Sequence, residues 1–343
     1  MQIKAVLLVI NALLITLVAA QTPPAPQNVD RVLRFAHTGS EQGFQEIATL
    51  IRSMTDIRKL SFEETPKGLA VSGTPGQVAL AEWLFYELDQ SGDRQLPWRE
   101  YRISDDGTDS VRLFYLKHSR KPEQLQEVAT VVRTTAEIRR LFTCNGPNAI
   151  AARGTAEQMR LAEWLVNRLD QPSAQPLRPA AVPYQMSNTG RDVVTVFYLP
   201  HVEAGQALQE TAVIVRLLAD MRWVFLCNAT KAMTVRGSAE QIKLAEWLVN
   251  EFNQPADREG LQRDKQPHAA CEYRFPGSSD DLVRVFHLAR TQAPPRLQDI
   301  ATRVRVGSQV RRIFTFTNGP AIALRGTSNQ LAQAQRLVKE HDQ

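Results

Sequence analysis

The sequence lacks the short motifs that mark the common catalytic sites. It contains no Gly-x-Ser-x-Gly elbow of a serine hydrolase, no phosphate-binding P-loop and no His-Glu-x-x-His zinc motif. It also lacks the glycine-rich fingerprint of dinucleotide-binding proteins. No acidic pair or nucleophile stands apart from the repeated pattern described below. We therefore expect a protein that is not an enzyme and that uses no cofactor.

Long apolar runs are missing everywhere except at the N-terminus. Residues 1–20 carry a single charged side chain and an apolar run over Ala5–Leu17. This pattern is typical of a secretory signal peptide, with cleavage between Ala20 and Gln21. An uncleaved anchor is the competing interpretation, for which the run is short. Residues 21–30 are expected to form a leader, and the mature chain is expected to be exported, periplasmic or secreted, with no membrane span.

An excess of one charge sign is also absent. The chain has 41 basic and 36 acidic residues, a formal net charge of +5, and 43% hydrophobic residues. The hydrophobic content excludes a disordered chain. The charge balance allows an anionic partner but does not require one, because most charges belong to a mixed, solvated surface.

One helical pattern is present four times. Its second copy runs from Arg153-Gly-Thr155 to Pro172, with Ala162, Leu165 and Leu169 in one apolar stripe. Every copy begins with a hydroxyl residue followed three positions later by Gln, which is the capping-box spacing. The expected N-cap residues are Thr74, Thr155, Ser238 and Thr327. Four such helices indicate internal repeats.

A strand pattern, a helix pattern and a hairpin pattern precede each capped helix. In the second repeat the hairpin turns at Asn145–Asn148, and the spacing from Phe114 to Trp164 is the same in every repeat. Tyr101, and its counterparts in the next two repeats, indicate an additional strand that the first repeat lacks.

We therefore predict an α+β protein of four tandem βαββα modules. Each module is expected to hold a small three-stranded sheet with two helices on one face, and modules 2–4 are expected to have an extra N-terminal strand. The expected bounds of the four modules are residues 31–91, 101–172, 184–255 and 272–343.

The entry to the capped helix, and its end, resemble the N-terminal modules of bacterial secretins. The matching stretches are Leu69–Thr74, Leu88–Gln90, Arg153–Thr155 and Leu169–Gln171. These are features of the N1-type, ring-building-motif modules, and the resemblance covers most of the chain after the leader. It implies a binding or scaffold protein of the cell envelope that acts by protein–protein assembly or self-association. No secretin channel domain follows the repeats, so the resemblance implies an adaptor and not a pore.

The alternative hypothesis is a basic module array that binds an anionic polymer, either a cell-envelope polysaccharide or nucleic acid. Two repeated sets of arginines would form the basic stripe: Arg52, Arg133, Arg216 and Arg305 on the first helix, and Arg58, Arg139, Arg222 and Arg311 at the second strand. The competing interpretation is intramodule pairing with repeated carboxylates, namely Glu46, Glu127, Glu210, Asp299, Glu82, Glu163 and Glu246. KH-type nucleic-acid modules share the βαββα order, but no Gly-x-x-Gly loop joins two helices here, so nucleic acid is not the expected partner.

Histidine and cysteine recur at fixed repeat positions. His37, His118 and His201 follow the first strand, and we expect them to close a loop and not to bind metal, because no further ligands have suitable spacing. Cys144 and Cys227 also share a position, and equivalent positions in separate modules seldom reach the ~6 Å between Cα atoms of a disulfide. We expect half-buried free thiols there. Cys271 is the odd cysteine, and its state stays open.

The last helix of modules 1–3 carries a Leu and a Trp three residues apart, on one face. These pairs are Leu80 and Trp83, Leu161 and Trp164, and Leu244 and Trp247. The fourth copy has Gln333 and Arg336 instead. Because terminal repeats need a polar outer surface, we predict that these Leu–Trp faces contact the following module and that Arg336 faces solvent. The alternative is that each Trp covers the edge of its own sheet.

Overall fold

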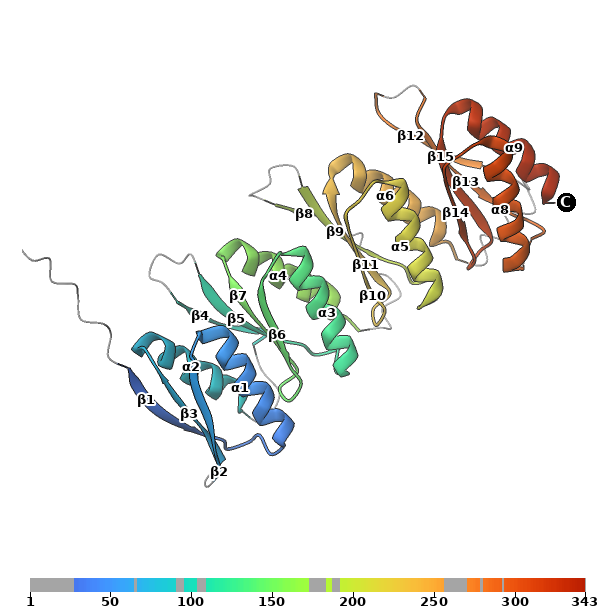
Figure 1. The fold of residues 1–343 in the computed structure, drawn as a ribbon. Helices are drawn as coiled ribbons and strands as arrows, with labels where there is room; N and C mark the ends of the chain where they lie inside the picture. The colour runs from blue at the N-terminus through green and yellow to red at the C-terminus, as the bar shows by residue number, and fades with distance from the viewer. Residues whose placement is uncertain are drawn as a thin grey trace, which may run out of the picture.

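The structure is a computed structural model that describes residues 28–342 except 65–66, 91–95, 104–108, 173–182, 187–191, 256–269, 278–279 and 292. The predicted signal peptide, with its cleavage point at Ala20–Gln21, lies outside the described residues. Four modules follow one another along the chain, each with a small sheet and two helices (Figure 1). The predicted fold class is confirmed.

Module 1 has three strands and two helices. They are β1 (Val29–Arg34), α1 (Glu41–Thr55), β2 (Lys59–Glu64), β3 (Lys67–Gly73) and α2 (Pro75–Leu88). Its described sheet is antiparallel in the order β1-β3-β2, so β3 forms the centre. Helix α1 connects the two outer strands, and α2 lies beside it on the same face (Figure 1).

Modules 2–4 repeat this arrangement and add one edge strand. Module 2 has β4 (Trp98–Arg102), β5 (Ser110–Tyr115), α3 (Pro122–Thr135), β6 (Arg140–Cys144), β7 (Ala149–Gly154) and α4 (Ala156–Leu169). Module 3 has β8 (Tyr184–Gln185), β9 (Asp192–Tyr198), α5 (Gln206–Leu218), β10 (Trp223–Cys227), β11 (Ala232–Ser238) and α6 (Ala239–Phe252). Module 4 has β12 (Ala270–Arg274), β13 (Leu282–His287), α8 (Pro294–Ser308), β14 (Arg312–Phe316), β15 (Ala321–Gly326) and α9 (Ser328–His341).

Three modules begin earlier than the sequence predicts. Strand β1 begins at Val29, inside the expected leader, because its ladder with β3 continues to Gly73. Strand β4 begins at Trp98 and β12 at Ala270, each paired with the strand that follows it.

The capped helices begin at the predicted residues. On α4, the Gln158 N–H donates to the Thr155 hydroxyl at 3.3 Å, and the Gln158 side chain accepts from the Thr155 N–H at 3.0 Å. The same reciprocal bonds start α2, α6 and α9, at Thr74, Ser238 and Thr327. Gly154 stands before the cap because a Cβ there would lie 2.5 Å from Oε1 of Gln158, the atom that closes the box. The Gly of the Arg-Gly-Thr motif is thus part of the helix start.

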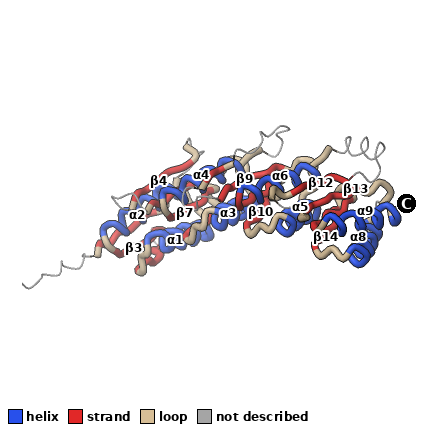
Figure 2. The backbone as a smooth tube through the Cα atoms, turned by 90° about the horizontal axis from the view of Figure 1, so that it is seen from above, coloured by secondary structure: helices blue, strands red, loops and turns tan. Residues whose placement is uncertain are grey.

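The sheets of modules 2–4 are covered on both faces. The helices of the preceding module lie against the face that the module's own helices leave open (Figure 1, Figure 2). All six residues of β5 are consequently buried, although a strand with one wet face alternates. Three apolar clusters each cross from one module into the next. The modules therefore share their cores, which the sequence did not predict.

The loop between the first strand and the first helix is held by the end of the last helix. In module 1, Asp89 accepts backbone hydrogen bonds from Ala36 and Thr38 at 2.6 and 2.7 Å. Asp170, Asn253 and Asp342 accept at the same place in modules 2, 3 and 4. This is the role of the Asp in the Leu-Asp ending of the motif. Among the described residues, no helix combines the length and the apolar character that crossing a membrane requires.

Candidate functional site: the module boundaries

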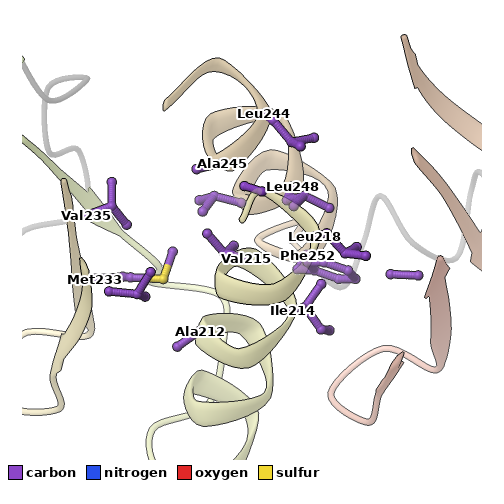
Figure 3. Packing of buried hydrophobic residues seen from close by; sticks show 14 of the residues in the cluster. Ala212, Ile214, Val215, Leu218, Met233, Val235, Leu244, Ala245, Leu248 and Phe252 are labelled. Carbon is purple, nitrogen blue, oxygen red and sulfur yellow. The ribbon is translucent and has the colours of Figure 1, made fainter. Parts of the chain in front are cut away.

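The three boundaries between successive modules repeat one set of contacts, and we call them boundary 1–2, boundary 2–3 and boundary 3–4. At boundary 3–4, helices α5 and α6 lie between two sheets. Met233 and Val235 of their own sheet pack on one side, and a strand of module 4 lies on the other (Figure 3). Phe252 of α6 and Phe316 of β14 meet there with ring centroids 4.7 Å apart. Burial of such apolar area is the main favourable term in both folding and association.

The predicted Leu–Trp faces lie at these boundaries. Leu80, Leu161 and Leu244 are buried within clusters that include strands of the next module. Each Trp is half-buried against a Tyr on the first strand of the next module. The ring centroids are 5.5 Å apart for Trp83 and Tyr101, 5.6 Å for Trp164 and Tyr184, and 5.6 Å for Trp247 and Tyr273. At the end of the array, Gln333 and Arg336 are exposed.

The arginine of the Arg-Gly-Thr motif binds across each boundary. Arg236 is 5% exposed, and its Nη1 donates to the Thr135 carbonyl at 3.2 Å and to Glu137 at 3.0 Å. Its Nε donates to Asp192 of its own module at 3.1 Å. A cation at the last turn of α3 suits both the unpaired carbonyls and the helix dipole. Equivalent bonds join Arg153 to Met54, and Arg325 to Leu218.

The residue just after the first helix supplies the acidic partner. Asp56, Glu137 and Asp220 all have a left-handed backbone, with φ of 61°, 54° and 51°. Hydrogen bonding to the Arg140 guanidinium lowers the pKa of Asp56 below its usual value, and Arg153 adds to this. The same kind of contact, chiefly to Asp281 and also to Asp220, raises the pKa of Arg325. These are ion pairs at the rim of each boundary, around the apolar centre.

A glutamate on the first helix binds the hairpin of the next module. Glu46 of α1 accepts from the Asn145 backbone N–H at 2.8 Å and from its side-chain amide at 2.7 Å. Glu127 binds Asn228 in the same way, at 3.0 and 2.9 Å. Glu210 binds the backbone N–H and the hydroxyl of Thr317, both at 2.8 Å. These bonds fix the next hairpin relative to the helix before it.

Each terminal module lacks part of this contact set on the side where it has no neighbour. Module 1 has Ser72 where the later modules have the bridging arginine, and Glu63 where two of them have a buried cysteine. Module 4 has Gln309 in place of the acidic residue after the first helix. Its α8 also has the exposed Arg303 where modules 1–3 bury Leu50, Val131 and Ile214. Both ends of the array are polar where the inner faces are apolar.

The expected intramodule pairing of the repeated arginines with the repeated carboxylates is wrong. Arg133, Arg216 and Arg305 donate to backbone carbonyls of the following strand, at Leu141, Val224 and Ile313. The carboxylates Glu46, Glu127 and Glu210 are instead bound to the next module. Glu82 and Glu163 pair with Arg31 and Arg112, which belong to neither repeated set. The second set, at positions 58, 139, 222 and 311, is exposed in all four modules.

The repeated histidines lie on the loop after the first strand. His37 donates its backbone N–H to Asp89, and its Nδ1 lies 2.7 Å from the Asp89 carbonyl oxygen. His37 and His118 both line a cleft of about 1220 Å³ at boundary 1–2, together with the Asn145–Asn148 turn. His118 and His201 are exposed. The contacts of His37 close its loop, in the role that the sequence indicates.

The cysteines of the described chain are free. Cys144 and Cys227 are fully buried, and not half-buried as expected, because the helices of the preceding module cover them. Burial raises the pKa of the Cys144 thiol to about 12, with a further contribution from Glu46. Such thiols are poor nucleophiles and behave as small apolar side chains. Cys271 is half-buried.

Sequence reasoning missed the polar half of the boundaries. The sequence alone assigns no contact to the arginine of the Arg-Gly-Thr motif. It predicts that the helix glutamates pair with arginines of their own module. A signal was present: both the arginine and the buried cysteine position change character in module 1, and the acidic residue after the first helix changes in module 4. Substitutions confined to a terminal copy identify contacts with a neighbour.

Comparisons with known proteins add the following. No family model and no curated protein matches the chain. Among solved structures, it is similar to the N-terminal domain of the secretin XcpQ from Pseudomonas aeruginosa, with 17% identity, 42% of this chain and 63% of that chain covered, and a TM-score of 0.19. It is also similar to the type II secretion system secretin GspD of Escherichia coli K12, with 11% identity, 88% and 59% covered, and a TM-score of 0.17.

An aspartate kinase from Synechocystis matches at 10% identity, with 92% of this chain and 54% of that chain covered, and a TM-score of 0.17. The chain thus spans less than two thirds of the length of each of these structures. The neighbours thus include secretin N-terminal domains.

Proposed function

We propose that this chain is an exported, non-catalytic scaffold protein of the cell envelope, built from N1-type secretin modules, that acts by protein–protein assembly. The observation that carries the proposal is the stacking of the modules. The apolar module faces are buried inside the chain, and its two ends carry polar residues in place of several of the apolar ones. The four modules therefore form one continuous body. The surfaces that remain exposed along its length are the ones available to bind partners.

The sides of modules 3 and 4 are the surface that best fits such a partner. Val213 and Leu217 of α5 are 42% and 43% exposed, and Val306 of α8 is 74% exposed. The first two lie one turn apart on one face of the helix. Modules 1 and 2 have Thr or Ser at the equivalent positions, namely Thr49, Ser53, Thr130 and Thr134. The apolar character is therefore specific to two modules and is not a requirement of the fold. We call these three residues the apolar strip.

Light scattering coupled to size-exclusion chromatography tests the proposal, with further copies of this chain as the first candidate partner. We expect an assembled mass for the chain, and a single-chain mass for the variant Val213→Thr/Leu217→Thr/Val306→Thr. The variant copies residues that modules 1 and 2 already tolerate. Val32→Thr is the matched control, because Val32 is also an exposed apolar residue, 43% exposed, but lies on module 1. A single-chain mass for the unmodified chain at all concentrations would contradict self-assembly.

Binding of an anionic polymer is the second candidate, and one observation favours it. Arg58, Arg139, Arg222 and Arg311 are all exposed, one in each module, at the same position. Titration with heparin or single-stranded DNA at increasing salt distinguishes the two functions. Polymer binding should weaken steeply with ionic strength, because bound counterions are released, whereas association through the apolar strip should not. Replacement of all four arginines by Ser should abolish the former and leave the latter unchanged.

A further inference from the structure

Among the residues that the structure describes, one group of potential metal ligands converges. It consists of Glu251 on the last turn of α6, Cys271 on β12 and His287 on β13. One ligand atom of each, a carboxylate oxygen, Sγ and an imidazole nitrogen, lies within 4.8 Å of the other two. The group lies at boundary 3–4, since α6 belongs to module 3 and the two strands to module 4. We call it the Glu–Cys–His group.

The backbone explains why the three side chains meet. Cys271 is paired with Val285 in the β12–β13 ladder. Side chains alternate between the two faces of a sheet, so Cys271 and His287 point to the same face, at diagonal positions. That face is the one covered by the helices of module 3. Glu251, on α6, lies against it beside Cys271 and His287. The His287 Nε2 and a Glu251 carboxylate oxygen are 3.5 Å apart.

The equivalent positions at the other boundaries show a different chemistry. At boundary 1–2 the corresponding residues are Glu87, Arg99 and Tyr115. There the Tyr115 hydroxyl donates to Glu87 at 3.2 Å, and Arg99 lies 3.7 Å from the same carboxylate. At boundary 2–3 the Tyr198 hydroxyl donates to the Arg168 carbonyl at 2.7 Å. At these positions the two boundaries are closed by ordinary hydrogen bonds and, at boundary 1–2, by the Arg99–Glu87 ion pair.

Boundary 3–4 keeps the glutamate and replaces both of its partners. The arginine position holds Cys271 and the tyrosine position holds His287. Neither residue type is a requirement of this place in the fold, since an arginine and a tyrosine occupy it at boundary 1–2. Both are instead the side chains that bind zinc most often, and the retained carboxylate is a third accepted ligand. At the same place in the fold, boundary 1–2 therefore has residues that form an ion pair and a hydrogen bond, and boundary 3–4 has three residues that can bind a metal ion.

We propose that Glu251, Cys271 and His287 bind one Zn²⁺ ion at boundary 3–4. A thiolate with an imidazole selects a borderline-soft cation over Mg²⁺ or Ca²⁺, which prefer oxygen ligands. In a tetrahedral zinc site the ligand atoms lie ~3.3–3.8 Å apart, so the group closes by small side-chain rotations. Three protein ligands leave the fourth position for water. On binding, the Cys271 thiol releases its proton to solvent and a sulfur–zinc bond forms, without any change of oxidation state.

The ion would tie the last helix of module 3 to two strands of module 4. The metal would thus stabilise boundary 3–4 at the place where boundary 1–2 has the hydrogen bond between Tyr115 and Glu87. Because metal binds the folded group and the unfolded chain lacks it, Zn²⁺ should raise the unfolding temperature of the chain, and EDTA should reverse the rise.

Cobalt absorption spectroscopy on the reduced, tag-free chain tests the site directly. Co²⁺ in a thiolate-containing tetrahedral site gives a sulfur-to-cobalt charge-transfer band and intense visible bands, which Zn²⁺ then removes. We expect one Co²⁺ per chain, displaced by one Zn²⁺. The variant Cys271→Arg/His287→Tyr copies the residues of boundary 1–2, so it should fold, keep its circular-dichroism spectrum and show neither band. Cys227→Ala, which removes a buried cysteine of module 3, should leave the bands unchanged.

Three results would overturn the proposal. The first is the absence of the charge-transfer band from the reduced chain. The second is a band that persists in Cys271→Arg/His287→Tyr, which would place the metal elsewhere. The third is an unfolding temperature that responds to Zn²⁺ equally in the chain and in the double variant. None of these outcomes depends on the apolar strip, so the proposed scaffold function can fail or succeed separately.

Discussion

Arg153, Arg236 and Arg325 each serve two modules at once. One nitrogen of the guanidinium caps the first helix of the module before, and another binds a carboxylate within the arginine's own module, such as Asp192 for Arg236. The planar, forked guanidinium suits this double contact, which a lysine could not reproduce. Because Arg236 is almost fully buried, its loss leaves polar groups without partners in an apolar boundary, which is where the free-energy cost arises.

We predict that Arg236→Ser lowers the free energy of unfolding by about 2 kcal/mol, the usual range for hydrogen bonds to charged groups. Serine is the residue that module 1 has at this position, where no neighbour precedes it, so the local backbone accepts it. Urea unfolding followed by tryptophan fluorescence measures the change. Arg222→Ser, at an exposed position nearby, is the control and should be neutral. Equal stability of the two variants would contradict the bridging role.

Gly154→Ala should break the start of α4. The added Cβ would displace the Gln158 side chain from the cap and cost about 1 kcal/mol, the value of a lost N-cap. Gly146→Ala is a suitable control, because a Cβ at Gly146 meets no atom within 4 Å. Urea midpoints of the two variants give the comparison. A neutral Gly154→Ala would mean that the capping Gln is not required.

At the scale of elements, the helices carry two apolar faces. The second helix of each of modules 1–3 packs on its own sheet with one face and on the next sheet with the other, and this is why Leu80 and Phe85, five positions apart, are both buried. In module 4 the outer face is polar, and α9 keeps only Leu331, Ala334 and Val338 buried. The difference between α9 and the inner helices is therefore the difference between one packing partner and two.

The Trp–Tyr pairs predict a measurable coupling between neighbouring modules. Trp164→Ala should cost about 2 kcal/mol, less than for a fully buried aromatic residue because the ring is half-buried. Tyr184→Ala should be less costly. In a double-mutant cycle the two changes should be coupled by about 1 kcal/mol, the usual value for aromatic pairs in contact. Strictly additive costs would show that the Trp ring stabilises only its own module.

Much of each element could be predicted from the sequence, and the reason is local. Capping boxes, turn residues and apolar periods act within a few residues, so Thr155 and Gln158 suffice to place the start of α4. The shared cores could not be predicted this way. Whether the second apolar face of β5, which begins at Ser110, meets solvent or another module depends on the helices of the preceding module, including α2, which ends at Leu88. The Glu–Cys–His group escaped notice for the same reason, since its members come from three elements of two modules.

At the scale of the whole molecule, the two end modules of the array differ from its middle. The open sheet face of module 1 holds Asp30, Arg34 and Glu63. The corresponding residues of module 2 are Val111, Tyr115 and Cys144. Module 4 presents Arg303, Gln333 and Arg336. Polar end units are what repeat proteins need to stay soluble and to stop end-to-end growth.

Removal of module 4, by ending the chain at residue 255, should therefore expose an apolar face and cause association. Ile214, Leu244 and Trp247 would be uncovered. Transfer of the module 4 residues to these positions, as Ile214→Arg/Leu244→Gln/Trp247→Arg, should reduce the association. Light scattering on the two shortened chains makes the comparison, and both carry Val213→Thr/Leu217→Thr so that the apolar strip does not contribute. Equal association of the two shortened chains would contradict the capping argument.

The direction of stacking has a consequence for synthesis. The sheets of modules 2–4 each have their second face covered by the helices of the module before, and never by those of the module after. A chain that leaves the ribosome or a translocation channel N-terminus first therefore presents the covering helices before the sheet that requires them. At any moment during synthesis, only the two helices of the newest module have an exposed apolar outer face. The helices of module 4 have a polar outer face, which can stay in contact with solvent. The order of the modules is thus also an order of assembly, in which every completed module is the template for its successor.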